Sequence, residues 1–176
     1  MVKIMIRSRN IFLIGMSGVG KSTIGKQLAN ELKMVFYDSD EIIEKRCGAE
    51  ISWILDIEGE EGFRKRESDI IYEFTEKKGI VLATGSGVVL KKSNCNRLSA
   101  RGTVIYLRAS LKLHVERSLR DKKKYLIQKQ NQEIELRKIQ EKRDPLYNRI
   151  SDIIIDANSS SIRSIVNNIL DKLNEK

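Results

Sequence analysis

Five short runs of mostly apolar residues recur along the chain, and they predict five β-strands. They are IFLI (11–14), MVFY (34–37), IVLA (80–83), TVIYL (103–107) and DIIID (152–156). Most of these runs are continuously apolar rather than alternating between apolar and polar residues. That pattern is typical of strands covered on both faces, as in a parallel sheet.

The segments between the strands have the spacing of amphipathic helices. Helical patterns cover about 21–33, 59–78, 110–120, 132–149 and 161–173. Alternating strands and helices predict one three-layer, doubly wound α/β domain over residues 1–176, with a five-stranded parallel sheet and right-handed crossovers. Ligands of such domains bind at the carboxyl ends of the strands.

The loop after the first strand has the sequence GMSGVGKST (15–23), which matches the P-loop pattern in its usual place between a strand and a helix. Glycines let backbone N–H groups turn inward, and the helix N-terminus adds positive potential, so the loop binds phosphates. Lys21 is expected to reach the β- and γ-phosphates and to act in catalysis, and Ser22 to ligate Mg²⁺. The expected nucleotide contacts are Gly18, Val19, Gly20, Lys21, Ser22 and Thr23.

The rest of the sequence favours a small kinase among the P-loop proteins. A guanine-reading NKxD motif is missing from the sequence. The segment IIID (153–156) has the form of a Walker B strand end, but it lies in the last predicted strand. Asp38, at the end of the second strand, is the better acidic candidate for the metal.

Two acids at the end of the second strand admit two interpretations. Asp38 or Ser39 could cap the helix that contains EIIEKR (41–46). Alternatively, Asp38 lies near Mg²⁺ through water, while Asp40 accepts a hydrogen bond from the acceptor hydroxyl and orients it for attack.

Two further segments are ambiguous in the same way. In GEEGFRKRE (59–67), Glu60 and Arg64 have the spacing of a surface ion pair, but Arg64 could also clamp a carboxylate. The segment TGSG (84–87) after the third strand is either an ordinary turn or a place where backbone N–H groups approach a ligand.

Together these segments resemble the shikimate kinase family. The resemblance covers about residues 9–171 and rests on RNIFLIGMSGVGKSTIG, FYDSD, EGEEGFRKRE, IVLATGSG, RLSARG, RDKK and KRDPLY in this order. It implies a kinase that transfers the γ-phosphoryl group of MgATP to the 3-hydroxyl of shikimate, in the pathway to chorismate and the aromatic amino acids.

The resemblance also implies roles for individual residues. Asp40 would bind the shikimate hydroxyls and serve as the base, and Asp38 would support Mg²⁺. Arg64 and Arg143 would grip the shikimate carboxylate. Backbone donors would come from the turn Gly85, Ser86 and Gly87.

The nucleotide side of the resemblance involves later segments. The polar stretch 120–132, which taken alone is either a solvated loop or a mobile lid, becomes a lid whose Lys124 reaches the phosphates in catalysis. Arg117 would pack on adenine, and the segment from Asn158 to Ser161 would close over it. Residues 38–78 would form the substrate-binding segment.

The sequence departs from the family in the Gly-rich turn and in the lid. Ser86 replaces the usual middle glycine, and Lys124-Tyr125 replaces Arg-Pro. A side chain at position 86 would crowd the substrate or disfavour a positive φ, and it is harmless if φ is negative. On this basis Ser86→Gly is expected to raise activity or leave it unchanged.

Charge and composition bound the alternatives. The net charge of +9 suits anionic ligands, while 6% aromatic residues and the lack of a nucleic-acid-binding motif argue against nucleic acid. Two functions stay open besides the main one. The first is a related P-loop kinase for gluconate or a nucleoside monophosphate, and the second is a degenerate protein that binds nucleotide without transferring phosphate.

The remaining features predict a cytoplasmic monomer. Cys47 and Cys95 are expected to be free thiols, the N-terminus lacks the apolar core of a signal peptide, and no apolar run approaches the ~20 residues of a membrane span. His114 is expected on an exposed helix face.

Overall fold

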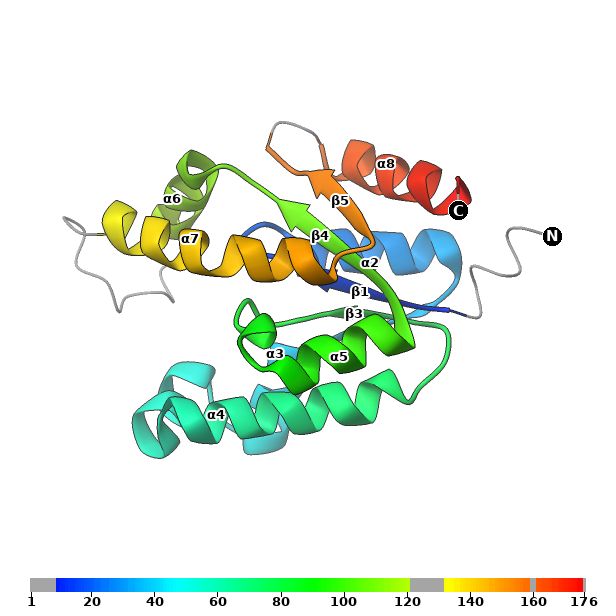
Figure 1. The fold of residues 1–176 in the computed structure, drawn as a ribbon. Helices are drawn as coiled ribbons and strands as arrows, with labels where there is room; N and C mark the ends of the chain where they lie inside the picture. The colour runs from blue at the N-terminus through cyan, green and yellow to red at the C-terminus, as the bar shows by residue number, and fades with distance from the viewer. Residues whose placement is uncertain (1–8, 121–131, 159–160, 176) are drawn as a thin grey trace.

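The protein folds around one parallel five-stranded sheet (Figure 1). The computed structural model describes residues 9–120, 132–158 and 161–175. The strand order is β2-β3-β1-β4-β5. The strands are β1 (Asn10–Ile14), β2 (Val35–Asp38), β3 (Ile80–Ala83), β4 (Gly102–Arg108) and β5 (Ile153–Asp156). The five strands predicted from the apolar runs are therefore confirmed.

The helices account for most of the remaining described chain. They are α2 (Lys21–Leu32), α3 (Ser39–Cys47), α4 (Ile51–Thr75), α5 (Lys92–Arg101), α6 (Leu111–Arg120), α7 (Gln132–Ile150) and α8 (Ile162–Asn174), with a 3₁₀ turn at Val88–Leu90. Gly59 has φ of 71° and kinks α4, so the helix predicted from about 59 is its second half. The first half of α4 and the whole of α5 have no counterpart in the sequence-based prediction.

Two layers of helices cover the sheet, as the three-layer prediction requires (Figure 1). One layer contains α2 and α8, and the other contains α3, α4, α5 and α7. In β1, Ile11 and Leu13 pack with the first layer, whereas Phe12 and Ile14 pack with the second. This two-sided burial explains why the strand has no polar alternation.

The pairing register brings three loops to one edge of the sheet. Asp38 of β2 pairs with Ala83 of β3, and Ala83 pairs with Leu13 of β1. Thr84 then bonds back to β1, donating from both its N–H (3.1 Å) and its hydroxyl (3.0 Å) to the Leu13 carbonyl. The P-loop, the Asp38 segment and the Gly-rich turn therefore all begin at the same place.

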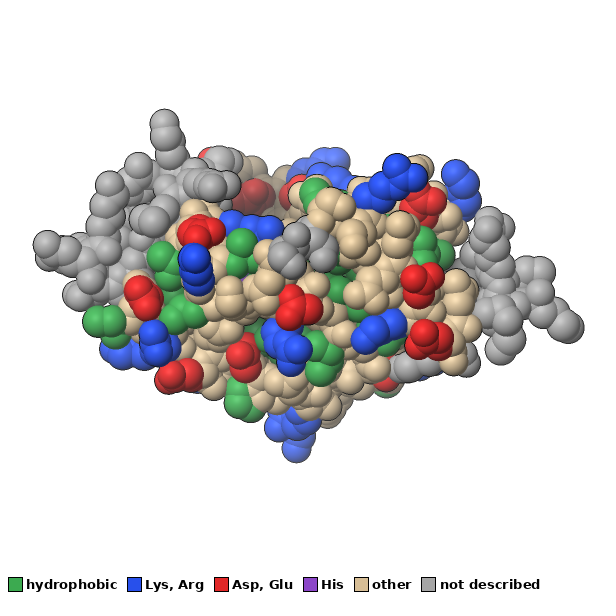
Figure 2. Space-filling view, turned by 90° about the horizontal axis from the view of Figure 1, so that it is seen from above, with side chains coloured by type: hydrophobic (Ala, Val, Ile, Leu, Met, Phe, Trp, Pro, Cys, Tyr) green, Lys and Arg blue, Asp and Glu red, His purple; other side chains and the backbone are tan. Residues whose placement is uncertain are grey.

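The surface mixes charges of both signs. On the face seen in Figure 2, Lys and Arg side chains alternate with Asp and Glu, with no long stretch of one sign among the described residues. Within the described ranges, no helix is long and apolar enough to cross a membrane.

Candidate active site

A cavity of about 320 Å³ lies where the three loops meet. Its walls come from the P-loop, from the start of α3 and from the Gly-rich turn. The lining residues are Ser17, Gly18, Gly20, Lys21, Ser22, Thr23, Asp38, Asp40, Thr84 and Ser86. The register of the sheet therefore joins the predicted nucleotide residues to the predicted acceptor residues.

The P-loop has the backbone geometry of an anion site. Gly15, Gly18 and Gly20 have φ of 143°, 78° and 106°, which side chains other than glycine rarely adopt. A Cβ on Gly15 would also lie 2.6 Å from the Leu107 carbonyl oxygen. Helix α2 begins without a side-chain cap, so the N–H groups of its first turn face the cavity edge, where an anion would be stabilised.

Lys21 is buried, and its ammonium lies over its own loop. Its Nζ donates to the carbonyl oxygens of Gly15 and Met16, each at 2.8 Å. These bonds hold a positive charge at the cavity wall, where phosphate groups would need it.

Asp38 has two functions at once. Its Oδ1 caps α3 by accepting from the N–H groups of Asp40 (2.9 Å) and Glu41 (3.2 Å). Its Oδ2 accepts a hydrogen bond from the Ser22 hydroxyl. The capping interpretation and the metal interpretation are therefore compatible, because each uses a different oxygen.

The oxygens of Ser22 and Asp38 suit a hard cation. Among the described residues, no group of three or more His, Cys, Asp or Glu side chains could hold a metal by itself. Magnesium needs no such cage, since it commonly binds through one or two side-chain oxygens together with phosphate and water.

Asp40 lines the cavity, and one of its carboxylate oxygens is buried against Gly85 of the Gly-rich turn. Its Oδ1 has no hydrogen-bond partner among the described residues. Burial, and secondly the charge of Asp38, raise the pKa of Asp40 to about 6, while Lys21 opposes the shift. An Asp with this pKa is a stronger base than usual and is still mostly ionised at neutral pH.

Arg64 is held mainly by an acid that the sequence reasoning missed. Its Nη1 lies 2.8 Å from Glu67 Oε2, whereas the expected partner Glu60 lies 3.4 Å away and is exposed. Glu67 is fully buried, and burial raises its pKa, although the nearby Arg64 charge opposes the shift. The sequence signal that could have identified Glu67 is its place on the apolar stripe of a helix, between Phe63 and Ile70.

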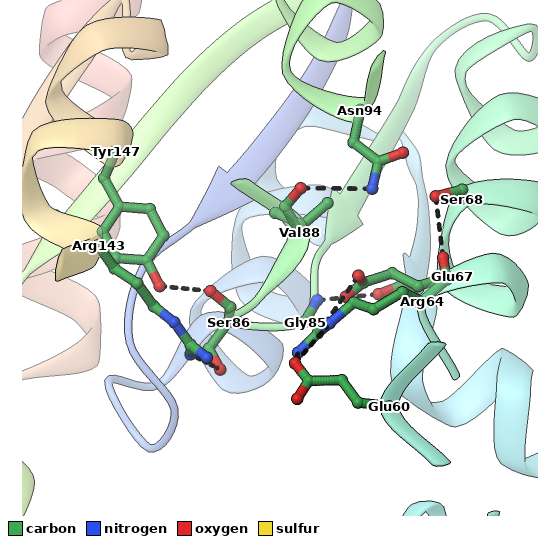
Figure 3. A network of polar contacts seen from close by, with 11 residues as sticks. Glu60, Arg64, Glu67, Ser68, Gly85, Ser86, Val88, Asn94, Arg143 and Tyr147 are labelled. Carbon is green, nitrogen blue, oxygen red and sulfur yellow. Dashed lines mark hydrogen bonds and ion pairs between the residues drawn. The ribbon is translucent and has the colours of Figure 1, made fainter. Parts of the chain in front are cut away.

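The Gly-rich turn passes closely between these groups, which explains two of its glycines (Figure 3). A Cβ on Gly85 would lie 2.7 Å from Asp40 Oδ1, and one on Gly87 would lie 2.3 Å from the Arg64 guanidinium. The Gly85 N–H donates to Ser39 Oγ at 3.0 Å. The predicted role of the turn as a donor to substrate therefore rests on the N–H groups of Ser86 and Gly87.

Arg143 approaches the same turn from the other side. It lies on α7, and its Nη1 donates to Ser86 Oγ at 3.0 Å. Tyr147, one helical turn further on, donates from its hydroxyl to the Ser86 carbonyl at 2.5 Å. Figure 3 shows Arg64 and Arg143 on opposite sides of the turn. The tertiary fold thus brings the two predicted carboxylate-binding arginines to one place.

Of the residues expected to contact adenine, Arg117 lies beside the P-loop and Asn158 lies beside Ser110, just before α6. Arg117 of α6 donates from Nη1 to the carbonyl oxygens of Gly18 (2.9 Å) and Val19 (2.7 Å). Asn158, after β5, accepts from the Ser110 N–H at 2.6 Å. Lys124, nearly all of the expected lid and positions 159–160 lie outside the described residues.

His114 is not on the surface, so that expectation is wrong. Only 2% of the residue is exposed, and it packs against the P-loop, where it is hydrogen-bonded to the Ser17 backbone. Burial, and next the charge of Lys21, lower its pKa. The misplacement arose because helical periodicity shows which side of a helix is apolar, not which polar side chain a neighbouring loop covers.

Comparison with known proteins agrees with this geometry. The model of the family "Shikimate kinase" matches residues 17–174. A shikimate kinase of Pseudoalteromonas atlantica is 53% identical over 171 residues, covering 97% of this chain and all of that protein. The chain belongs to the shikimate kinase family. The match spans the P-loop, the acceptor segments and α7.

Solved structures give the same result. The fold matches the shikimate kinase from Acinetobacter baumannii, solved in complex with shikimate, with a TM-score of 0.92 and 39% identity over 99% of this chain and 98% of that one. A gluconokinase from Sinorhizobium meliloti also matches, with a TM-score of 0.63 and 17% identity over 96% and 93% of the two chains. At that identity the second likeness shows a common fold alone.

Proposed function

We propose that this protein transfers the γ-phosphoryl group of MgATP to the 3-hydroxyl of shikimate, giving shikimate 3-phosphate and ADP. The observation that carries the proposal is that one cavity joins a P-loop to Asp40, with two arginines beside it. A hydroxyl to be phosphorylated and an anionic handle on the same small molecule would both find partners there.

The P-loop would hold the triphosphate. The N–H groups of the glycine-rich turn and of the first turn of α2 would donate to phosphate oxygens. Lys21 would exchange its bonds to the Gly15 and Met16 carbonyls for bonds to the β- and γ-phosphates. The backbone N–H groups and the Lys21 ammonium are donors whose interactions with the phosphates strengthen as negative charge shifts during transfer.

Ser22 and Asp38 would hold the metal, with Ser22 as a direct ligand and Asp38 acting through water. Their mutual hydrogen bond already places the two oxygens at one point of the cavity. A bound Mg²⁺ would neutralise charge on the phosphates.

Asp40 would bind and orient the acceptor hydroxyl. Its unpartnered Oδ1 faces the turn, and its raised pKa suits a group that accepts the hydroxyl proton. Arg64 and Arg143 would fix the carboxylate at the far end of the acceptor, since guanidinium groups bind carboxylates in a planar, two-point manner. Holding both ends positions the hydroxyl for attack.

The remaining assignments follow the family resemblance. Residues 38–78 would carry the acceptor, Arg117 and Asn158 would flank adenine, and 120–132 would close over the phosphates with Lys124. Closure would keep water from accepting the phosphoryl group. The proposal also includes that the protein acts as a monomer in the cytoplasm and binds neither membranes nor nucleic acid.

A coupled ADP-release assay tests the proposal. The protein is supplied with MgATP and shikimate, gluconate, AMP or no acceptor. We expect turnover only with shikimate. Turnover with gluconate or AMP would assign a different acceptor, and ATP binding without acceptor-dependent ADP release would indicate the degenerate alternative. Omitting Mg²⁺ should abolish turnover.

A further inference from the structure

The serine in the middle of the Gly-rich turn makes a specific contact that the sequence did not reveal. Its φ is not among the positive values, so Ser86 has a backbone conformation open to any residue. Its side chain also has room, unlike side chains at the two flanking positions. Gly85 and Gly87 face Asp40 and Arg64 too closely for a Cβ.

The Ser86 hydroxyl points away from that crowded side and toward α7. There its Oγ accepts a hydrogen bond of 3.0 Å from Arg143 Nη1 (Figure 3). A guanidinium has five N–H donors in a fixed plane, so this bond leaves donors for a carboxylate. Ser86 also lines the cavity, which places its contact with Arg143 at the cavity wall.

The turn and the helix are held together at a second point. Tyr147 is fully buried and donates to the Ser86 carbonyl at 2.5 Å, while its ring lies 5.0 Å from that of Tyr106. Burial is the main cause that raises the pKa of Tyr147, while the nearby Arg143 charge opposes the shift. The backbone of the turn is therefore tethered independently of the Ser86 hydroxyl.

We propose that Ser86 is a positioning residue for Arg143, and that its hydroxyl pre-orients the guanidinium for the carboxylate of the acceptor. The inference rests on the proposed function for the identity of that acceptor. Ordering a long side chain before binding reduces the entropy lost when the ligand arrives. The proposed role of Ser86 is opposite to the sequence-based expectation that Ser86→Gly raises activity or leaves it unchanged.

The expected effect is on substrate affinity rather than on turnover. The carboxylate lies away from the transferred phosphoryl group, so contacts to it bind ground state and transition state alike. Ser86→Ala and Ser86→Gly should weaken shikimate binding roughly 3- to 10-fold, which is the cost expected for one side chain that must be ordered on binding. The kcat and the KM for ATP should be unchanged, and Ser86→Thr, which keeps a hydroxyl, should restore most of the affinity.

A matched control and a double-mutant cycle separate this role from a general loss of structure. Ser68→Ala also removes a hydroxyl from the network in Figure 3, but that hydroxyl donates to the backbone carbonyl of Arg64 at 2.9 Å, not to a guanidinium. It should leave shikimate affinity unchanged. In an Arg143→Ala background, Ser86→Ala should have almost no further effect, because its action passes through Arg143.

The experiment is calorimetric titration of shikimate into the unchanged protein and these variants, beside arginine side-chain NMR of isotope-labelled protein without ligand. We expect the Arg143 guanidinium to rotate faster in Ser86→Gly than in the unchanged protein. Equal rotation, or an Ser86→Ala effect that persists without Arg143, would overturn the inference. If the unchanged protein bound no shikimate, the proposed function would fail, while the NMR comparison would still decide the role of Ser86.

Discussion

The Ser22 hydroxyl donates a hydrogen bond to Asp38 Oδ2, which joins the first turn of α2 to the N-cap of α3. The contact connects the P-loop directly to the end of β2, two residues before Asp40. It also makes Asp38 both a structural cap and a candidate metal-site residue, and mutation can separate the two roles.

Asp38→Asn should remove the charge and keep the cap, because Asn is an equally good N-cap. We expect kcat to fall roughly 10- to 100-fold, as for residues that orient a metal's ligands, with little change in the free energy of unfolding. Asp38→Ala should lose the same activity and also about 1 kcal/mol of stability. Steady-state kinetics and urea denaturation check both. Full Mg²⁺-dependent activity in Asp38→Asn would reduce Asp38 to a cap.

Asp40→Asn should lower kcat by about 10²- to 10⁴-fold, because the amide cannot accept the hydroxyl proton. Its affinity for ATP should change little, since the nucleotide is held by the P-loop. Glu41→Gln is the matched control, because Glu41 is a neighbouring acid that is exposed and pairs with Lys26 at 3.3 Å. Turnover near the normal rate in Asp40→Asn would mean that the acceptor needs no base at this position.

Gly87→Ala should impair acceptor binding by displacing Arg64. A Cβ there would lie 2.3 Å from the guanidinium, so the side chain must move away. We expect the KM for shikimate to rise about 10-fold, as for the loss of a charge-assisted hydrogen bond, with the KM for ATP unchanged. In Arg64→Ala the clash is absent, so adding Gly87→Ala should then change nothing. A further loss in that background would point to the turn itself.

His114 should make stability depend on pH. Its pKa is lowered by burial, so below its unfolded pKa of about 6.5 the unfolded chain binds more protons than the folded chain. The stability that neutral His114 provides is therefore present above about pH 6.5 and is lost as pH falls through its folded pKa. His114→Gln should abolish this loss.

Urea denaturation of both proteins at several pH values checks the prediction. The difference between them isolates His114 from Asp40 and Glu67, whose pKa values are raised. Those acids act with the opposite sign, since their contribution is lost as pH rises. Parallel stability curves for the two proteins would show that His114 does not titrate in this range.

Local sequence patterns predicted most of the secondary structure but missed α5. Its segment KSNCNRLSAR is rich in Ser and Asn, which favour caps and turns over helix interiors, and its buried apolar side chains are Cys95 and Leu98. Packing of those two residues against the second layer outweighs weak helix propensity. The first half of α4 was missed because the kink at Gly59 interrupts its periodicity.

Single polar residues in the core were harder to place than elements. Glu67 and His114 are each buried by a neighbour from elsewhere in the chain, Glu67 beside the Gly-rich turn and His114 against the P-loop. A local pattern records which face of a helix is apolar. It does not record which distant loop will cover a given side chain or supply its hydrogen bond.

The sequence by itself determined the fold class, the five strands and the phosphate-binding loop. Each of these follows from short-range physics, namely the burial period of strands and helices and the positive φ that only glycine adopts readily. Only the tertiary structure decided how the acceptor end is built. Strand register sets Asp40 beside the P-loop, and helix packing brings Arg64 and Arg143 to opposite sides of the turn. Those contacts join segments far apart in the chain, so no local pattern specifies them.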